Sequence, residues 1–262
     1  MFWCPTGPFT FLPIHAAGFY GPEYSQSEHK VFDFVVSSYV PTLSILAQPP
    51  NLIAAPISDL RLLIVRQPSS DGQQKLPGVA TEVGYIRGVI KNSPAACTTL
   101  LESFAGTVEE VLDLMKHADW VHFSCHGIQD STNPIESGLC LADKRRMKVS
   151  DMLALSRPRH GGLAFLSACQ TAMGNERLPD EAIHIAAGML FAGFEGIVGT
   201  MWSISDSLAP VVASEVYERL FGNGKMPDHR EAAQALHEAI ECVRRSSSAS
   251  FEEWILFIHV GL

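Results

Sequence analysis

Two short apolar segments of the chain end in side chains that together could perform nucleophilic chemistry. The segment 120–127 leads to His126 and Gly127, and the segment 163–171 leads to Cys169 among small residues. Both have the length and apolar content of buried strands. If they are parallel strands of one sheet, the imidazole and the thiol emerge at its carboxyl edge, where open α/β sheets bind ligands. A thiol beside an imidazole is the minimum equipment for acyl transfer.

The residue types assign distinct roles within such a site. Cys169 would attack a peptide carbonyl as the thiolate, and His126 would accept protons and return one to the departing amine. The negative charge that develops on the carbonyl oxygen needs backbone donors, and the amides of Gly127 and Cys169 are suitably placed. A glycine after the histidine also lets a substrate approach the backbone closely.

Other chemistries fit these residues less well. His122 shares a strand face with His126, but zinc needs four converging ligands and this face offers two at most, so no metal or other cofactor is expected. An α/β-hydrolase would need a G-x-S-x-G elbow, which the chain lacks. Cys125 points to the opposite strand face from His126 and is predicted to be structural.

Composition indicates a compact chain with a large core. Of the 262 residues, 47% are hydrophobic and only 18% are charged, and the formal charge of −9 disfavours binding to nucleic acid or to anionic membranes. The amino-terminus has no basic start, so it is a poor signal peptide, and no apolar run reaches the roughly 18 residues of a membrane span. The six cysteines show no disulfide framework, which favours reduced thiols and a cytoplasmic location.

Hydrophobic patterns alternate between strand and helix along the chain. Expected strands lie at 9–12, 32–36, 59–65, 120–126, 139–141, 163–169, 196–202 and, as an edge strand, 254–260. Expected helices lie at 41–46, 80–89, 150–155, 179–191, 207–221 and 230–244, and another begins at 107 and continues through 115. Thr107 and Glu110 form the pattern of a capping box, and side chains 108, 111, 112 and 115 form one apolar helix face. The alternation predicts one α/β domain with a mainly parallel sheet flanked by helices.

Several ordered motifs resemble one protein family, the CHAT domain. They are HFSCHG (122–127), LSACQTA (166–172), LPDEA (178–182) and GTMWSI (199–204), joined by FLPIHAAG (11–18) and VSSYVPTL (36–43). The CHAT family comprises caspase-like cysteine peptidases related to separase and often joined to tetratricopeptide repeats. The caspase signature itself is matched in part: Ala168 and Gln170 flank the cysteine as expected, whereas Ser167 and Thr171 replace its glutamine and glycine.

The resemblance implies a caspase-hemoglobinase-like fold with His126 and Cys169 as the catalytic dyad. It also implies substrate-binding roles for a set of nearby residues, namely Ser124, Asp180, Trp202, Ser203 and Asp206. Alternatives remain open for three of them. Asp180 either binds a basic substrate residue, as in separases, or stabilises the first turn of a helix. Trp202 either lines a cleft that pairs with extended substrate or packs internally. Asp206 either caps the following helix or lines the pocket.

Together these observations predict a cysteine endopeptidase module of CHAT type over residues 1–262, as a fragment or carboxyl-terminal part of a longer protein. Its partners would be protein or peptide substrates, and a tetratricopeptide-repeat or sensor region upstream would regulate it. The alternative is a catalytically silent interaction or signalling module that keeps the fold. The presence of both dyad residues counts against that alternative.

Overall fold

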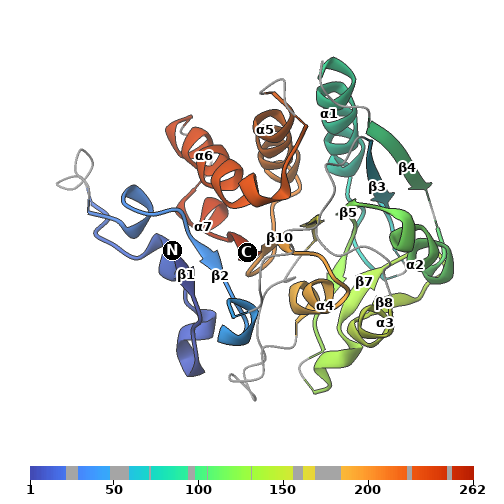
Figure 1. Ribbon diagram of the computed structural model, residues 1–262, viewed down its shortest axis with the longest axis horizontal. Helices are drawn as coiled ribbons and strands as arrows, with labels where there is room; N and C mark the ends of the chain where they lie inside the picture. The colour runs from blue at the N-terminus through green and yellow to red at the C-terminus, as the bar shows by residue number, and fades with distance from the viewer. Residues whose placement is uncertain are drawn as a thin grey trace.

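A computed structural model of the chain describes residues 1–21, 29–47, 59–70, 72–93, 98–104, 106–130, 132–155, 162–168, 184–222, 226–246 and 250–262, with the backbone alone at 98–104. Within these ranges the chain forms a mixed α/β structure around a twisted sheet (Figure 1). No helix among the described residues is long and apolar enough to cross a membrane.

The central sheet has eight strands among the described residues. They are β1 (Phe2–Trp3), β2 (Ser38–Tyr39), β3 (Leu60–Arg66), β4 (Thr98–Phe104), β5 (Trp120–Ser124), β9 (Leu163–Ser167), β10 (Gly196–Thr200) and β11 (Phe257–Gly261). Their order is β1-β2-β11-β10-β9-β5-β3-β4, and only β10 and β11 pair antiparallel. The mainly parallel sheet expected from the sequence is therefore confirmed, and the ends of β3, β5, β9 and β10 share one carboxyl edge.

Two layers of helices cover the sheet. One face carries α1 (Gly78–Asn92), α5 (Ala209–Phe221), α6 (Ala232–Arg245) and α7 (Phe251–Trp254), and the other carries α2 (Val108–His117), α3 (Val149–Ala154) and α4 (Ile185–Phe191) (Figure 1). Alternation along β3 explains both cores: Leu62 and Ile64 pack under the first layer, and Leu63 and Val65 under the second. Strands buried on both faces read as continuous apolar runs, which is why the sequence located them.

A second, smaller sheet begins directly after His126. It consists of three antiparallel strands, β6 (Gly127–Ile128), β7 (Gly138–Cys140) and β8 (Arg146–Lys148). The sequence had indicated only the strand at 139–141. Because β6 starts at Gly127, this sheet fixes the backbone that leaves the candidate histidine.

The amino-terminal segment differs from the expected strands. Residues 9–12 and 32–36 were expected to be strands, but they contain the 3-10 helices Gly7–Phe11 and Val31–Asp33. Pro8 opens the first of these helices, and the Asp33 carboxylate accepts the Lys30 amide at the start of the second. Local turn chemistry thus outweighs the apolar content. The expected helix at 41–46 is one short 3-10 helix, Leu43–Ile45.

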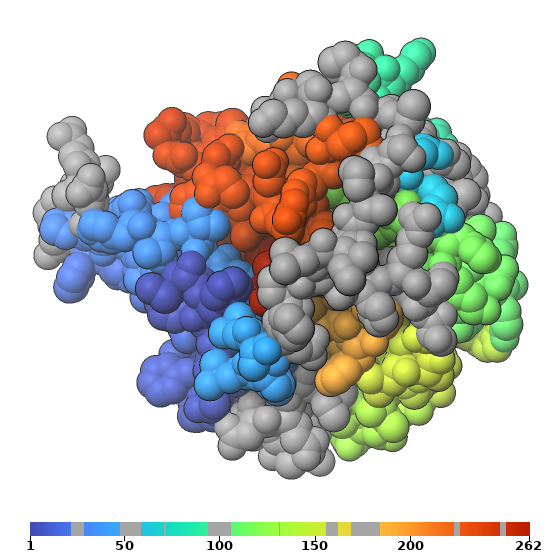
Figure 2. Space-filling view, in the orientation of Figure 1, coloured from blue at the N-terminus to red at the C-terminus, as the bar shows by residue number. Residues whose placement is uncertain are grey.

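The carboxyl-terminal strand is internal to the sheet, so the expectation of an edge strand at 254–260 is wrong. Trp254 ends α7, while β11 pairs with β10 on one side and with β2 on the other. The amino-terminal segment supplies that covering strand, which no local pattern could reveal. Figure 2 shows the blue amino-terminal residues lying against the orange carboxyl-terminal helices.

Candidate active site

The ends of β5 and β9 lie opposite each other at the carboxyl edge. Ser124 is the last residue of β5 and pairs with Ser167, the last residue of β9. The amide of Cys125 continues the link by donating to the Ser167 carbonyl at 3.4 Å. His126 follows at this edge. Cys169 and Asp180 lie outside the described residues.

His126 is held through its ring by the loop between β3 and α1. Its Nε2 lies 2.7 Å from the Gln74 carbonyl oxygen, and 9% of the residue is exposed. A carbonyl oxygen can only accept, so Nε2 carries a proton and donates it. In the neutral ring the lone pair then belongs to Nδ1, which is the atom available to act as a base.

The backbone of Gly127 has the geometry of an available donor. The Cys140 amide donates to the His126 carbonyl at 2.8 Å, so His126 and Cys140 form a hydrogen-bonded pair of the antiparallel ladder. Gly127 and Leu139 are the next pair and must be of the non-hydrogen-bonded kind. The Gly127 N–H therefore points away from β7.

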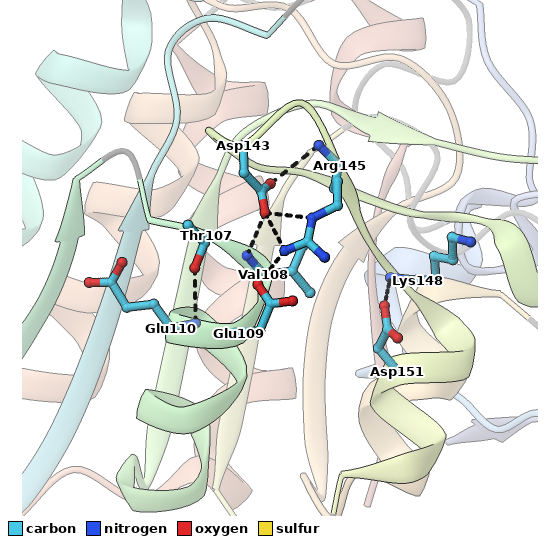
Figure 3. A network of polar contacts seen from close by, with 8 residues as sticks. All are labelled: Thr107, Val108, Glu109, Glu110, Asp143, Arg145, Lys148 and Asp151. Atoms are coloured by element: carbon cyan, nitrogen blue, oxygen red, sulfur yellow. Dashed lines mark hydrogen bonds and ion pairs between the residues drawn. The ribbon is translucent and has the colours of Figure 1, made fainter.

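A polar network anchors the β7–β8 hairpin to the start of α2 (Figure 3). Asp143 in the hairpin turn accepts the Val108 amide at 3.2 Å and the Arg145 Nε–H at 2.8 Å. Arg145 also pairs with Glu109, in the first turn of α2. The Thr107 hydroxyl accepts the Glu110 amide at 3.2 Å, which confirms the predicted N-cap. These contacts stabilise the hairpin whose strand β7 pairs with Gly127.

Ser124 belongs to a fully buried chain of hydrogen bonds. Its hydroxyl donates to Glu82 Oε2 at 2.8 Å, because a carboxylate can only accept, and its oxygen lies 2.9 Å from His122 Nε2, which then donates. Tyr217 completes the chain at His122 Nδ1, at 3.3 Å. Burial first, and then the charge of Glu82, raise the pKa of the Tyr217 hydroxyl, so it keeps its proton. No part of Ser124 is exposed, and its contact with a substrate stays a prediction.

Asp206 caps a helix, but not the helix that follows it. Its Oδ2 accepts the amide of Gly78, the first residue of α1, at 2.8 Å. The following helix α5 has Leu208 at its N-cap, without a side-chain bond. Gly78 is required for this close approach, since a Cβ there would lie 2.2 Å from the Asp206 carbonyl oxygen. The prediction that Asp206 caps the helix that follows it is therefore wrong, because Asp206 caps α1 instead.

Trp202 and Ser203 follow β10 at the same sheet edge. Trp202 is half-buried against both cores, and its Nε1 donates to the Glu252 carbonyl at 3.3 Å, which is the internal packing considered for it. Ser203 is exposed. Their contacts with substrate stay predictions.

The expected helix at 179–191 is seen only in part. Helix α4 begins at Ile185, because His184 has an extended backbone and its Nδ1 accepts the Ala187 amide at 3.1 Å. The preceding residues of the expected helix, including Asp180, fall outside the described ranges. The first-turn interpretation of Asp180 is thus left as a prediction.

Two positions near the site escaped sequence reasoning. Gln74 acts through its backbone carbonyl, so its side-chain type carries no signal. Thr200, the last residue of β10, is fully buried, and its hydroxyl donates to the Ala168 carbonyl at 2.8 Å. The one available signal was a hydroxyl residue at the end of an expected strand, inside the GTMWSI motif. Cys125, as predicted, lies in the apolar core of the opposite face.

The described residues hold no cluster of three or more histidine, cysteine, aspartate or glutamate side chains suited to a metal ion. A cavity of about 30 Å³ lies elsewhere, between β2, β11 and α6, and shares no residue with the candidate site.

Comparison with known families agrees with the motifs. The family model of the CHAT domain matches residues 1–262. The chain belongs to the CHAT domain family. No curated protein sequence matches this CHAT domain.

Solved structures share the fold of this CHAT domain. Gingipain R, an Arg-specific cysteine proteinase, has a TM-score of 0.53 at 12% identity, covering 77% of this chain and 46% of that chain. The complex of RgpB pro- and mature domains from Porphyromonas gingivalis has a TM-score of 0.50 at 12% identity, covering 77% and 47%. Separase in the Saccharomyces cerevisiae separase–securin complex has a TM-score of 0.55 at 14% identity, covering 87% and 14%.

These likenesses confirm the expected caspase-like fold. At such low identities they establish the fold alone. This CHAT domain also spans less than half the length of the gingipain chains and a small part of the separase chain.

Proposed function

We propose that this CHAT domain is a cysteine endopeptidase module that hydrolyses peptide bonds with His126 and Cys169. The observation that carries the proposal is the register of β5 and β9, in which Ser124 pairs with Ser167. His126 follows Ser124 by two residues, and Cys169 follows Ser167 by two residues. Equal spacing beyond paired strand ends favours delivery of both side chains to one point of the edge.

The bond between His126 Nε2 and the Gln74 carbonyl supports a definite proton path. With Nε2 protonated, Nδ1 accepts the Cys169 thiol proton as Sγ bonds to the substrate carbonyl carbon. The resulting oxyanion is held by the amides of Gly127 and Cys169. Nδ1–H then protonates the departing amine, and the C–N bond breaks to leave a thioester. Water hydrolyses the thioester, with His126 again acting as the base.

Substrate binding in this proposal uses the other residues at the edge. Trp202 and Ser203 would pair with extended substrate backbone, and Asp180 would contact a basic side chain. Ser124 and Asp206 contribute through their bonds to Glu82 and Gly78, which connect the edge to α1. The substrates are proteins or peptides.

The proposal extends to the setting of the domain. Residues 1–262 form one peptidase domain within a longer cytoplasmic protein, and a sensor or tetratricopeptide-repeat region regulates it. The six cysteines without disulfide-framework spacing support a reducing compartment.

The test compares Cys169→Ala and His126→Ala with the parent domain in a peptide-library cleavage assay. Each change should lower kcat/KM by more than about 10³-fold, as removal of a nucleophile or its base does elsewhere. Cys242→Ala is the matched control, because Cys242 is exposed on α6 and should leave cleavage unchanged.

Undiminished cleavage by Cys169→Ala would reject the peptidase. A folded parent domain without cleavage, and without His126-dependent labelling of Cys169 by an electrophilic peptide, would instead support the silent interaction module.

A further inference from the structure

The buried hydroxyl of Thr200 forms a hydrogen bond with the residue that directly precedes Cys169. It donates to the carbonyl oxygen of Ala168 at 2.8 Å, and Thr200 is fully buried. Ala168 directly precedes Cys169 in the chain. We propose that Thr200 is a positioning residue that orients the amide of Cys169 as an oxyanion donor. This inference rests on the proposed peptidase function.

Peptide geometry connects the two groups. The carbonyl of Ala168 and the N–H of Cys169 belong to one peptide group, which is planar and trans. In such a group the C=O and the N–H point in opposite directions. A hydrogen bond that fixes the carbonyl direction therefore also fixes the direction of the N–H, whatever conformation the Cys169 side chain adopts.

The position of Thr200 in the sheet makes this bond effective. The paired residues of β9 and β10 run from Leu163 opposite Gly196 to Phe165 opposite Val198. Thr200 lies farther along, at the end of β10, where it pairs with Phe257 of β11. Its hydroxyl therefore adds a side-chain link between β10 and the residue that follows β9. A central strand of the sheet thus restrains the Ala168 carbonyl.

The bond also affects the strength of the donor. A hydrogen bond received by a carbonyl polarises its peptide group and makes the N–H a better donor. Preorganised donors of this kind supply much of the stabilisation of an oxyanion. Thr200 would therefore assist acyl transfer without touching substrate.

The test uses two small reagents that differ in their need for an oxyanion hole. p-Nitrophenyl acetate acylates Cys169 through a tetrahedral oxyanion, whereas iodoacetamide alkylates the thiolate by displacing iodide and forms no oxyanion. Mass spectrometry of the Cys169 peptide follows both reactions, with Cys169→Ala as the blank.

Thr200→Val keeps the shape of the side chain but removes the hydroxyl. We expect it to slow acylation roughly tenfold, less than the 10²–10³-fold loss seen when an oxyanion donor is removed outright. Alkylation should stay within about twofold, because the thiolate and its base are unchanged. Thr200→Ser keeps the hydroxyl and should preserve both rates.

Thr10→Val is the matched control. The Thr10 hydroxyl also donates to a backbone carbonyl, that of Gly7, at 2.7 Å, but it lies in the amino-terminal 3-10 helix. It should leave both rates unchanged, and thermal unfolding would verify that each variant is folded.

Two results would overturn the inference. One is acylation of Thr200→Val at the parent rate. The other is an equal loss of acylation and alkylation, which would mean that the change displaces the nucleophile. Failure of the peptidase proposal is distinct, since the parent Cys169 would then react with both reagents no faster than in His126→Ala, and the inference would fall with it.

Discussion

At the scale of single residues, a buried carboxylate lies behind the strand that leads to His126. Glu82 is 2% exposed, and its carboxylate accepts a hydrogen bond from the Ser124 hydroxyl. The Ser124 oxygen in turn accepts a hydrogen bond from His122 Nε2. A buried charge is tolerated only when its partners are in place, since removal of one partner leaves the charge uncompensated. Ser124 is therefore important for stability here, because it forms hydrogen bonds with both Glu82 and His122.

Replacing Ser124 by alanine should lower the free energy of unfolding by roughly 3 kcal/mol, because Glu82 and His122 both lose a partner. Tyr217→Phe removes only the neutral hydrogen bond between the Tyr217 hydroxyl and His122. It should lower the free energy of unfolding by about 1 kcal/mol. Urea unfolding measures both. Glu218→Gln, on the exposed side of α5, is the control. A change below about 0.5 kcal/mol for Ser124→Ala would contradict the account of the network.

At the scale of elements, the amino-terminal end of α1 and the loop before it connect two strands of the edge, β5 and β10. The preceding loop offers the Gln74 carbonyl to His126 after β5, and Gly78 offers its amide to Asp206 after β10. Glu82, one turn farther along, binds Ser124 at the end of β5. The loop before α1 and the first two turns of the helix therefore contact residues at the ends of β5 and β10.

Asp206→Ala removes the acceptor at the start of α1 and should lower the free energy of unfolding by about 1 kcal/mol. It should also speed hydrogen exchange at the Gly78 amide, which then lacks its partner. Asp206→Asn keeps an acceptor and should lose less than half as much. Chemical unfolding and amide exchange by NMR measure these effects, and an unchanged Gly78 exchange rate would refute the capping role.

At the scale of the whole molecule, the amino-terminal segment completes the sheet beside the carboxyl-terminal strand. Ser38 of β2 donates to the Gly261 carbonyl at 2.7 Å, so its oxygen accepts His259 Nδ1–H at 2.8 Å. His15 contacts the Tyr39 hydroxyl nearby, at 2.8 Å. Both histidines line the cavity between β2, β11 and α6. Two titratable rings are therefore buried where the two ends of the chain meet.

These histidines should make the domain less stable in mild acid. Burial lowers the pKa of His15 to about 4, although a hydrogen bond with the backbone of Ile255 raises it in part. Burial, and then the charge of nearby His229, lower the pKa of His259 to about 4. The unfolded chain takes up protons below pH of about 6.5, which the folded chain does not do until about pH 4. Stability is thus full above about pH 6.5 and falls as the pH drops toward 4.

The expected loss between pH 7 and pH 5 is roughly 2 kcal/mol for each histidine, measured by urea unfolding at both values. His259→Asn replaces the Nδ1 donor by an amide that does not titrate. It should remove about half of the pH dependence. An equally steep dependence in this variant would exclude His259 as the cause.

The sequence by itself determined the alternation of strands and helices. It also located the strands that lead to His126 and Cys169. Runs buried on both faces and the apolar face of α2 report burial directly, because side-chain periodicity follows backbone geometry. The motifs at 122–127 and 166–172 indicated the CHAT family and singled out His126 and Cys169. These features are local, so a linear pattern can carry them.

Only the tertiary structure decided which groups hold the candidate site together. Asp206 meets Gly78 across 128 residues, and His126 meets Gln74 across 52. The internal place of β11 likewise depends on a strand from the other end of the chain. These contacts form only when the whole sheet has folded. Several of them also use backbone atoms, which every residue type has, so the side-chain types give no signal. No local pattern records them, because their energy arises only once distant segments are side by side.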